Sequence, residues 1–250
     1  MQQVWTILQF FTRSYARLSL FRILILLFIA YIGVMYFIAE ASIQDHEKMI
    51  FDFTALFVQL TSMTVIVYWG GMLTASHRED RSFEVLLAGP VSRPAFIIGN
   101  FLGLIFCLFI YLFILAILWY GFVYLFVRLA IDWSIIGFWL YQYLGLVIMA
   151  SMAVCLAYFA EPATCLFILL GTWISGLLIR SIEYGLAEDT SPIIRSVIST
   201  TRKIWDLGKF YVVPDEVGPI SLLPYYLLYS LSLVGFFLGV TCIFVDRKDM

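Results

Sequence analysis

The stretch AFIIGNFLGLIFCLFIYLFILAILWYGFVYLFV, residues 95–127, decides the fold of this chain because it contains no charged side chain. A helix needs about 20 apolar residues to cross the hydrocarbon core of a bilayer, and this stretch is longer than that. We therefore expect it to tilt or to project beyond the bilayer. Trp119, Tyr120 and Tyr124 near its end are typical of the aromatic belt at a membrane interface.

The composition of the whole chain also favours a membrane protein. Of its 250 residues 63% are apolar and 13% are charged, and the mean hydropathy is +0.98. Soluble proteins are nearer to about half apolar and about a quarter charged. The net charge of -2 argues against a nucleic-acid partner, which favours a basic surface. The cysteines fall inside apolar segments, where they are predicted to be buried hydrophobic side chains and not disulfides or zinc ligands.

Six segments are predicted to be membrane-spanning helices, because each is apolar over the length that a bilayer requires. The predicted spans are residues 23–41, 53–75, 95–127, 134–159, 163–180 and 221–244. Glu161-Pro162 separates the fourth span from the fifth, since proline disfavours helix in the residue before it. The predicted fold is an all-α integral membrane protein with a single transmembrane domain over residues 1–250.

The distribution of Lys and Arg predicts that both termini lie in the cytoplasm. The N-terminal segment, the connection between the second and third spans, and the C-terminal tail are basic, with Arg13, Arg17, Arg22, Arg78, Arg81, Arg93, Arg247 and Lys248. The short connections on the other side hold only Lys48 and Arg128. The connection 181–220 is then extracytoplasmic although it holds basic residues, because longer connections follow the rule less strictly.

Two segments are predicted to lie on the membrane without crossing it. Residues 2–12 alternate apolar and polar side chains with a helical period, which indicates an interfacial N-terminal helix. Ser191-Pro192 is typical of a helix start, and the helix after it carries Ile198 and Trp205 on one side, with Gly208 as its expected stop. This helix either packs its own loop against the membrane domain or caps a translocation path.

The stretch HREDRSFEVLLAGPVSRP, residues 77–94, is a charged segment between two long apolar ones. Ser76 and Glu79 form a capping box, and Gly89-Pro90 is a typical helix terminator, so a short cytoplasmic helix is predicted over about residues 77–88. Apolar side chains share one face of it. Such a short helix persists only when that face is packed, either on its own membrane domain or in a groove of another protein.

The charged segment resembles the ABC-2 family of ABC exporter permeases, whose second and third spans are joined by a motif ending in Leu-Leu-x-x-Pro-Val-Ser-Arg. Here Glu79 begins the match and Ser82–Arg93 continue it as SFEVLLAGPVSR. The tail 244–250, FVDRKDM, is similar to the family's Phe-x-x-Arg-Arg-Asp ending. The chain departs from the motif at Arg81, where glycine is usual, at Ser82 for threonine, and at Asn100 for lysine.

The resemblance implies a permease subunit that lines the translocation path of an exporter in a prokaryotic plasma membrane. It implies two partners, a cytoplasmic ABC ATPase and a second permease copy, with ATP and Mg²⁺ bound by the ATPase. No G-x-x-x-x-G-K-[ST] loop occurs in this chain, so we expect no catalytic residues and no cofactor here. The residues expected to couple to the ATPase are Arg78, Glu79, Arg81, Phe83, Glu84, Leu86 and Leu87.

Other classes of function have weaker support in the sequence. An intramembrane Ser–His pair is disfavoured because His46 and His77 flank the spans and do not lie within them. Met149, Met152 and Cys155 could form a ladder for soft metals, but such side chains are ordinary core residues and we expect no metal site. The alternative to the exporter is a nucleotide-independent membrane scaffold or channel.

Small and ionisable residues give two further expectations. Small residues four apart let helices approach closely, and a subunit contact is predicted through Gly171, Ser175 and Gly176 of the fifth span. The pairs Gly99 and Gly103, and Gly235 and Gly239, have the same spacing. Ionisable residues in or near the membrane are costly; those at the ends of the fifth span either extend to the interface or line a substrate path. They are Glu161, Arg180 and Glu183.

Overall fold

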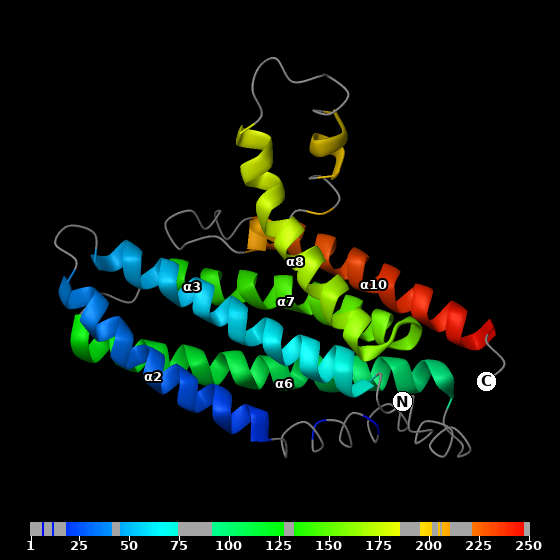
Figure 1. The fold of residues 1–250 in the computed structure, drawn as a ribbon, viewed down its shortest axis with the longest axis horizontal. Helices are drawn as coiled ribbons and strands as arrows, with labels where there is room; N and C mark the ends of the chain where they lie inside the picture. The colour runs from blue at the N-terminus through cyan, green and yellow to red at the C-terminus, as the bar shows by residue number, and fades with distance from the viewer. Residues whose placement is uncertain are drawn as a thin grey trace.

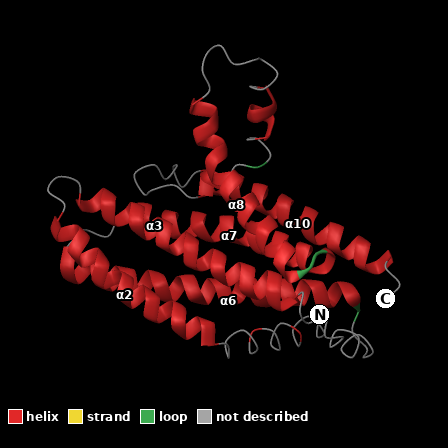
Figure 2. Ribbon diagram, in the orientation of Figure 1, coloured by secondary structure: helices red, strands yellow, loops and turns green. Residues whose placement is uncertain are grey.

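The computed structural model describes most of the chain, and all of the helices discussed below. The described residues are 19–41, 46–74, 92–127, 133–185, 196–201, 207–210 and 222–247, together with Ile7, Thr12 and Trp205. These residues form helices and no strand (Figure 2). The all-helical prediction is therefore confirmed for the part of the chain that the structure describes.

The helices follow one another as a series of long rods (Figure 1). In chain order they are α2 (Ser19–Ala41), α3 (His46–Val65), the π-helix η1 (Ile66–Leu73), α6 (Arg93–Phe122), the π-helix η2 (Val123–Val127), α7 (Trp133–Phe159), α8 (Pro162–Gly185), the 3₁₀ turn η3 (Leu207–Phe210) and α10 (Leu223–Arg247). A short helix comprises residues 196–201. Each of the six predicted segments falls on helical structure, the second on α3 and η1 and the third on α6 and η2.

Four of the described helical stretches are long and apolar enough to cross a membrane. They are Asp52–Gly71, Arg93–Leu125, Ile136–Phe159 and Leu223–Val245. The apolar stretches of α2 and α8, Leu24–Phe37 and Pro162–Gly176, are shorter. By length and composition the chain is thus an integral membrane protein with four candidate spans among the residues described.

Side-chain contacts fix the directions of the helices relative to one another. Thr54 of α3 bonds to Trp119 of α6, and Thr74, nearer the end of the same helical rod, bonds to Asn100, so α3 and α6 are antiparallel. The aromatic pair Tyr31–Phe57, stacked at 4.1 Å, belongs to the contact between α2 and α3. Figure 1 shows that α2 and α3 are antiparallel as well.

Helices α7 and α10 run in the same direction. Tyr141 meets Tyr226 edge to face at 5.1 Å, and Phe159 meets Phe244 in the same geometry at 5.5 Å. The two contacts are 18 residues apart on both helices, or about 27 Å at 1.5 Å per residue. The pair therefore keeps one register over most of its length.

Each helix buries one stripe and exposes the other, as lipid-facing helices do. In α2 the buried side chains are Leu24, Phe28 and Met35, at helical spacing, whereas Leu26 and Phe37 are 65% and 72% exposed. The largest fully buried side chains include Trp69, Tyr111 and Phe138. Trp69 of η1 and Tyr111 of α6 belong to the buried apolar cluster that these helices form with α7. Exposed apolar area of this kind is suited to lipid and would be unusual in water.

The C-terminal part of α8 leaves the other long helices, and the short helix 196–201 lies beside it (Figure 1). The prediction that this amphipathic helix continues to Gly208 is wrong. Its last turn closes where the Trp205 amide donates to the Thr201 carbonyl at 2.7 Å. Gly208 lies in the separate turn η3, which packs on α8 through Leu207.

Candidate functional site

The predicted coupling helix, with Arg78, Glu79, Arg81, Phe83, Glu84, Leu86 and Leu87, lies outside the described residues. So does the predicted interfacial helix 2–12, apart from Ile7. The structure does describe the residues on either side of the predicted coupling helix: Thr74 lies three residues before the charged segment, and the last residues of the segment, Ser92 to Pro94, enter α6. The candidate site is therefore the framework that holds these residues.

A buried hydrogen bond holds Thr74, the last described residue before the charged segment. The Asn100 side-chain amide donates to Thr74 Oγ1 at 3.2 Å. The Thr74 hydroxyl in turn donates to the Trp69 carbonyl at 3.2 Å. Asn100 is fully buried and Thr74 is 3% exposed. Since an unpaired amide in an apolar interior costs several kcal/mol, about 2–7, this pairing strongly favours one position for the end of η1.

An arginine anchors the C-terminal end of the charged segment. Arg93 is the first residue of α6, and its guanidinium Nη1 donates to the Val245 carbonyl at 3.1 Å. Val245 is among the last residues of α10, whose final carbonyls have no partner within the helix. A cation at a helix C-terminus also interacts favourably with the helix dipole. The two stretches that carry the family resemblance, residues 79–93 and 244–250, thus meet at this contact.

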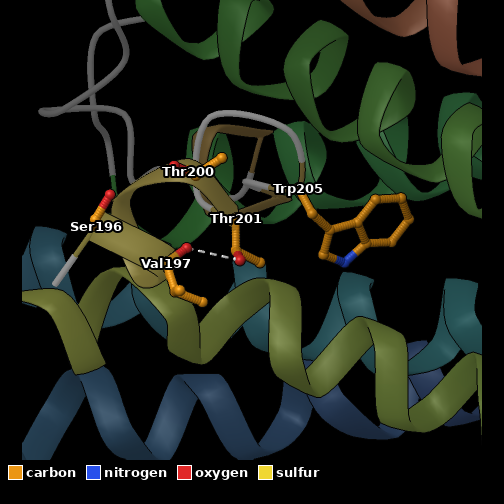
Figure 3. Close-up of a pocket in the computed structure, with 5 residues that line it drawn as sticks. All are labelled: Ser196, Val197, Thr200, Thr201 and Trp205. Atoms are coloured by element: carbon orange, nitrogen blue, oxygen red, sulfur yellow. Dashed lines mark hydrogen bonds between the residues drawn. The ribbon is translucent and has the colours of Figure 1, made fainter. Parts of the chain in front are cut away.

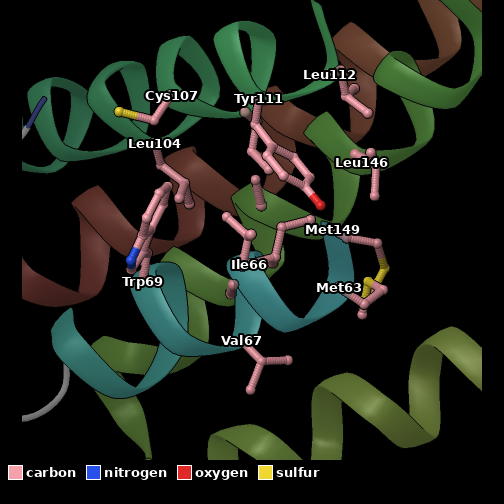
Figure 4. Packing of buried hydrophobic residues seen from close by; sticks show 14 of the residues in the cluster. Met63, Ile66, Val67, Trp69, Leu104, Cys107, Tyr111, Leu112, Leu146 and Met149 are labelled. Atoms are coloured by element: carbon pink, nitrogen blue, oxygen red, sulfur yellow. The ribbon is translucent and has the colours of Figure 1, made fainter. Parts of the chain in front are cut away.

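The π-helix η1, directly before the charged segment, is packed against three other helices. A Cβ atom at Gly70 would lie 2.8 Å from Leu104 of α6 and 3.0 Å from Ala153 of α7. A Cβ atom at Gly71 would lie 3.4 Å from Leu169 of α8. Figure 4 shows how Ile66 and Trp69 of η1 interleave with side chains of α6 and α7. The absence of a side chain at Gly70 thus allows the backbone of η1 to approach α6 and α7 closely, whereas the Gly71 position is in ordinary van der Waals contact with α8.

Sequence reasoning missed these anchoring residues. It named Asn100 only as a departure from the family motif, and it did not single out Gly70, Gly71 or Thr74. A Gly-Gly pair at the end of an apolar span, immediately before a charged segment, was the available signal. The π-helix itself could not be predicted, because an apolar run has no pattern that separates a π-turn from an α-turn. Such turns are frequent at functional sites.

The structure separates the three residues predicted for a subunit contact. Gly176 is buried against Leu207 of the same chain, since a Cβ there would lie 2.8 Å from Leu207 Cδ1. Gly171 has no atom within 4 Å of its Cβ position, and Ser175 is exposed. Gly235 and Gly239 on α10 are likewise open. Of the three residues predicted for the subunit contact, Gly171 and Ser175 are thus the two that are open to another molecule.

The three residues predicted for a substrate path are not brought together. Glu161 is exposed at the start of α8, where its carbonyl accepts the amide of Cys165 at 2.9 Å. Arg180 and Glu183 lie near the other end of the same helix. At 1.5 Å per residue, Glu161 and Arg180 are about 28 Å apart. These three residues therefore do not form one charged group at a single depth in the membrane.

Among the described residues, no group of three or more His, Cys, Asp or Glu side chains is placed to hold a metal ion. Met149 and Met152 are buried core residues.

No protein-family model matches the chain, and no curated protein matches it significantly.

Proposed function

We propose that this chain is the permease subunit of an ABC exporter, with six membrane spans and a cytoplasmic charged segment that receives movement from a separate ATPase. The ATPase would hold ATP and Mg²⁺, and a second permease copy would complete the translocation path. The proposal rests on the family resemblance of residues 79–93 and on the way the structure anchors the chain on either side of the predicted coupling helix.

The helix directions support six spans. Both α7 and α10 are long enough to cross a membrane and run in the same direction. The chain between them must therefore cross back, and α8 is the long apolar helix available for that crossing. In the same way, α2 packs on α3 and is antiparallel to it, as an additional span before α3 would be. With the basic connections inside, both termini and the charged segment lie in the cytoplasm.

The anchoring of the chain on both sides of the predicted coupling helix is the observation that carries the coupling role. Thr74, the last described residue before the segment, is bonded to Asn100, and Arg93, within its last residues, is bonded to Val245. A displacement of the segment would act on these two contacts and through them on α6 and α10. A freely tethered loop could move without moving the membrane helices.

The packing of η1 supports the transmission of that movement to further helices. Gly70 and Gly71 are in close contact with α6, α7 and α8, and packed interfaces respond by discrete shifts and not by compression. ATP can drive transport only if it binds the ATPase with different affinity in two arrangements of these helices. The charged segment is the part of this chain on which the ATPase would act to favour one arrangement over the other.

The test is to purify the tagged chain in mild detergent and to identify bound proteins by mass spectrometry. The wild type is expected to retain a stoichiometric ATPase. Replacing Phe83, Leu86 and Leu87 together by serine should remove the ATPase and abolish transport while membrane insertion persists. Leu125→Ser is the matched control, because Leu125 is 68% exposed and lies at the opposite end of the third predicted span.

Two outcomes would count against the exporter. If the triple variant keeps both its ATPase and transport, the coupling role of residues 77–88 is wrong. If the folded wild type carries no ATPase at all, the nucleotide-independent scaffold or channel becomes the better interpretation.

A further inference from the structure

A groove of about 480 Å³ lies between α8 and the short helix 196–201. Aliphatic side chains line most of it, among them Ile174, Leu178 and Ile182 of α8 and Ile198 of the short helix. Gly171 forms an open part of its wall, where a Cβ atom would touch nothing within 4 Å. The groove has the size of a small-molecule site, which is typically about 300–1,000 Å³.

Both hydroxyl groups in this groove donate hydrogen bonds to backbone carbonyls of their own helices. Ser175 Oγ donates to the Thr172 carbonyl at 2.9 Å, and Thr201 Oγ1 donates to the Val197 carbonyl at 2.9 Å. The helical backbone around them is bonded within its own helix. Among the described residues that line it, the groove therefore offers apolar surface to a ligand but no hydroxyl hydrogen-bond donor, which fits a hydrocarbon chain and disfavours a sugar or a peptide.

A second hollow of about 330 Å³ lies beside the groove on the short helix (Figure 3). Its lining residues are Ser196, Val197, Thr200, Thr201 and Trp205. Thr201 lines both the hollow and the groove. Ser196 and Thr200 are exposed. A ligand that extends from the groove past Thr201 would reach the hydroxyl groups of Ser196 and Thr200, which lie beside the apolar side chains of Val197 and Trp205.

Trp205 fixes the short helix in this position. Its indole Nε1 donates to the Thr172 carbonyl of α8 at 3.2 Å, and its ring meets Phe237 of α10 edge to face at 6.3 Å. Leu207, two residues later, fills the space at Gly176. The wall that the short helix adds to the groove is therefore attached to two long helices.

We propose that this groove holds one acyl chain of a bilayer phospholipid, with the glycerol region of that lipid at the hydroxyl groups of Ser196 and Thr200. The groove continues an apolar face of α8 on which Phe167 and Ile168 are exposed, so a chain can enter it from the surrounding bilayer. The lipid takes the place of a second subunit at Gly171 and Ser175. This inference goes beyond the proposed exporter, since lipid binding requires neither an ATPase nor transport.

The test uses the full chain in nanodiscs of phosphatidylcholine that carries a photoactivatable diazirine on one acyl chain. After illumination, mass spectrometry maps the labelled residues. We expect labelling to concentrate between Ile174 and Ile182 and at Ile198. Gly171→Trp, which fills the groove, should reduce this labelling about tenfold, because the loss of about two buried methylene groups at ~0.8 kcal/mol each has that effect.

Gly235→Trp is the matched control, because Gly235 is equally open but lies on α10, away from the groove. Its labelling between Ile174 and Ile182 should equal that of the wild type. If Gly171→Trp does not yield folded protein, Ile198→Ser on the short helix replaces it and should reduce labelling in the same region.

Two results would overturn the proposal. Labelling that is as strong at exposed residues of α10, such as Leu228 and Phe236, and that Gly171→Trp leaves unchanged, would mean bulk lipid only. Unlabelled groove residues, together with disulfide formation between two chains that carry Ser175→Cys, would mean that a second copy occupies this surface. Neither result depends on whether an ATPase binds the chain.

Discussion

The indole Nε1 of Trp119 donates a hydrogen bond to Oγ1 of Thr54 at 2.9 Å, and both residues are buried. The same hydroxyl donates to the Ile50 carbonyl at 2.6 Å and accepts a longer bond, 3.4 Å, from the Tyr31 hydroxyl. One threonine thus joins α2, α3 and α6 and uses all of its hydrogen-bonding capacity. In lipid, where water cannot replace a lost partner, such a junction stabilises the packing of three helices.

Thr54→Val should lower the free energy of unfolding by about 1–2 kcal/mol, because the indole and the phenol lose a buried acceptor. Thermal or denaturant unfolding in detergent measures the change. Thr64→Val on the same helix is the control: its hydroxyl is exposed and bonds only to the Leu60 carbonyl. An equal loss in both variants would show that the junction contributes nothing.

Gly70→Ala should destabilise the protein by about 1–3 kcal/mol, because the new Cβ atom has no room between α6 and α7. Gly235→Ala, at an open position, should be neutral or stabilising through its higher helix propensity, about 1 kcal/mol at most. Adding Ala153→Gly to Gly70→Ala should restore part of the loss by making space at one of the two contacts. The midpoint of thermal unfolding distinguishes these variants, and a stable Gly70→Ala would contradict the close packing of η1.

Two buried amides should respond with opposite signs to replacement by leucine. Neither amide atom of Gln142 has a hydrogen-bond partner among the described residues, although the side chain is fully buried. Gln142→Leu should therefore raise stability by about 1 kcal/mol. Asn100→Leu should lower it by about 1–3 kcal/mol, because it breaks the bond to Thr74. If both variants lose stability equally, the Gln142 amide does make a hydrogen bond in the protein, and the prediction for Gln142→Leu is wrong.

The return crossing between α7 and α10 can be tested by labelling from one side. In a variant without the native cysteines, Glu161→Cys and Leu222→Cys place a thiol at exposed positions before and after that stretch of chain. A membrane-impermeant maleimide applied to intact cells should label position 222, and position 161 should react only after permeabilisation. Labelling of both from one side would exclude a crossing by α8.

Helix positions were largely predictable from the sequence, because uninterrupted apolar runs fix where a span can lie. The fourth predicted span, 134–159, differs by one residue from Trp133–Phe159. The fifth was predicted to end at Arg180, yet α8 continues to Gly185, since a charged residue does not stop a helix that leaves the apolar core. The second was predicted as one helix and is divided between α3 and η1.

The contacts between helices were much less predictable. The pairs Thr74–Asn100 and Arg93–Val245 join residues far apart in the sequence, and each member is unremarkable within its own segment. Spacing suggested that Gly176 meets another subunit, whereas Leu207 of the same chain fills that space. A small residue indicates that something approaches closely, but the sequence alone does not identify which element it is.

The fixed register of α7 and α10 has a mechanical consequence. Two edge-to-face aromatic pairs about 27 Å apart prevent one helix from sliding along the other unless both contacts break together. The two helices are therefore expected to move together as one rigid pair. Arg93 is bonded to this pair at Val245, one residue beyond the Phe244 contact. A displacement of Arg93 would therefore act on the C-terminal end of this pair, about 27 Å from the contact between Tyr141 and Tyr226.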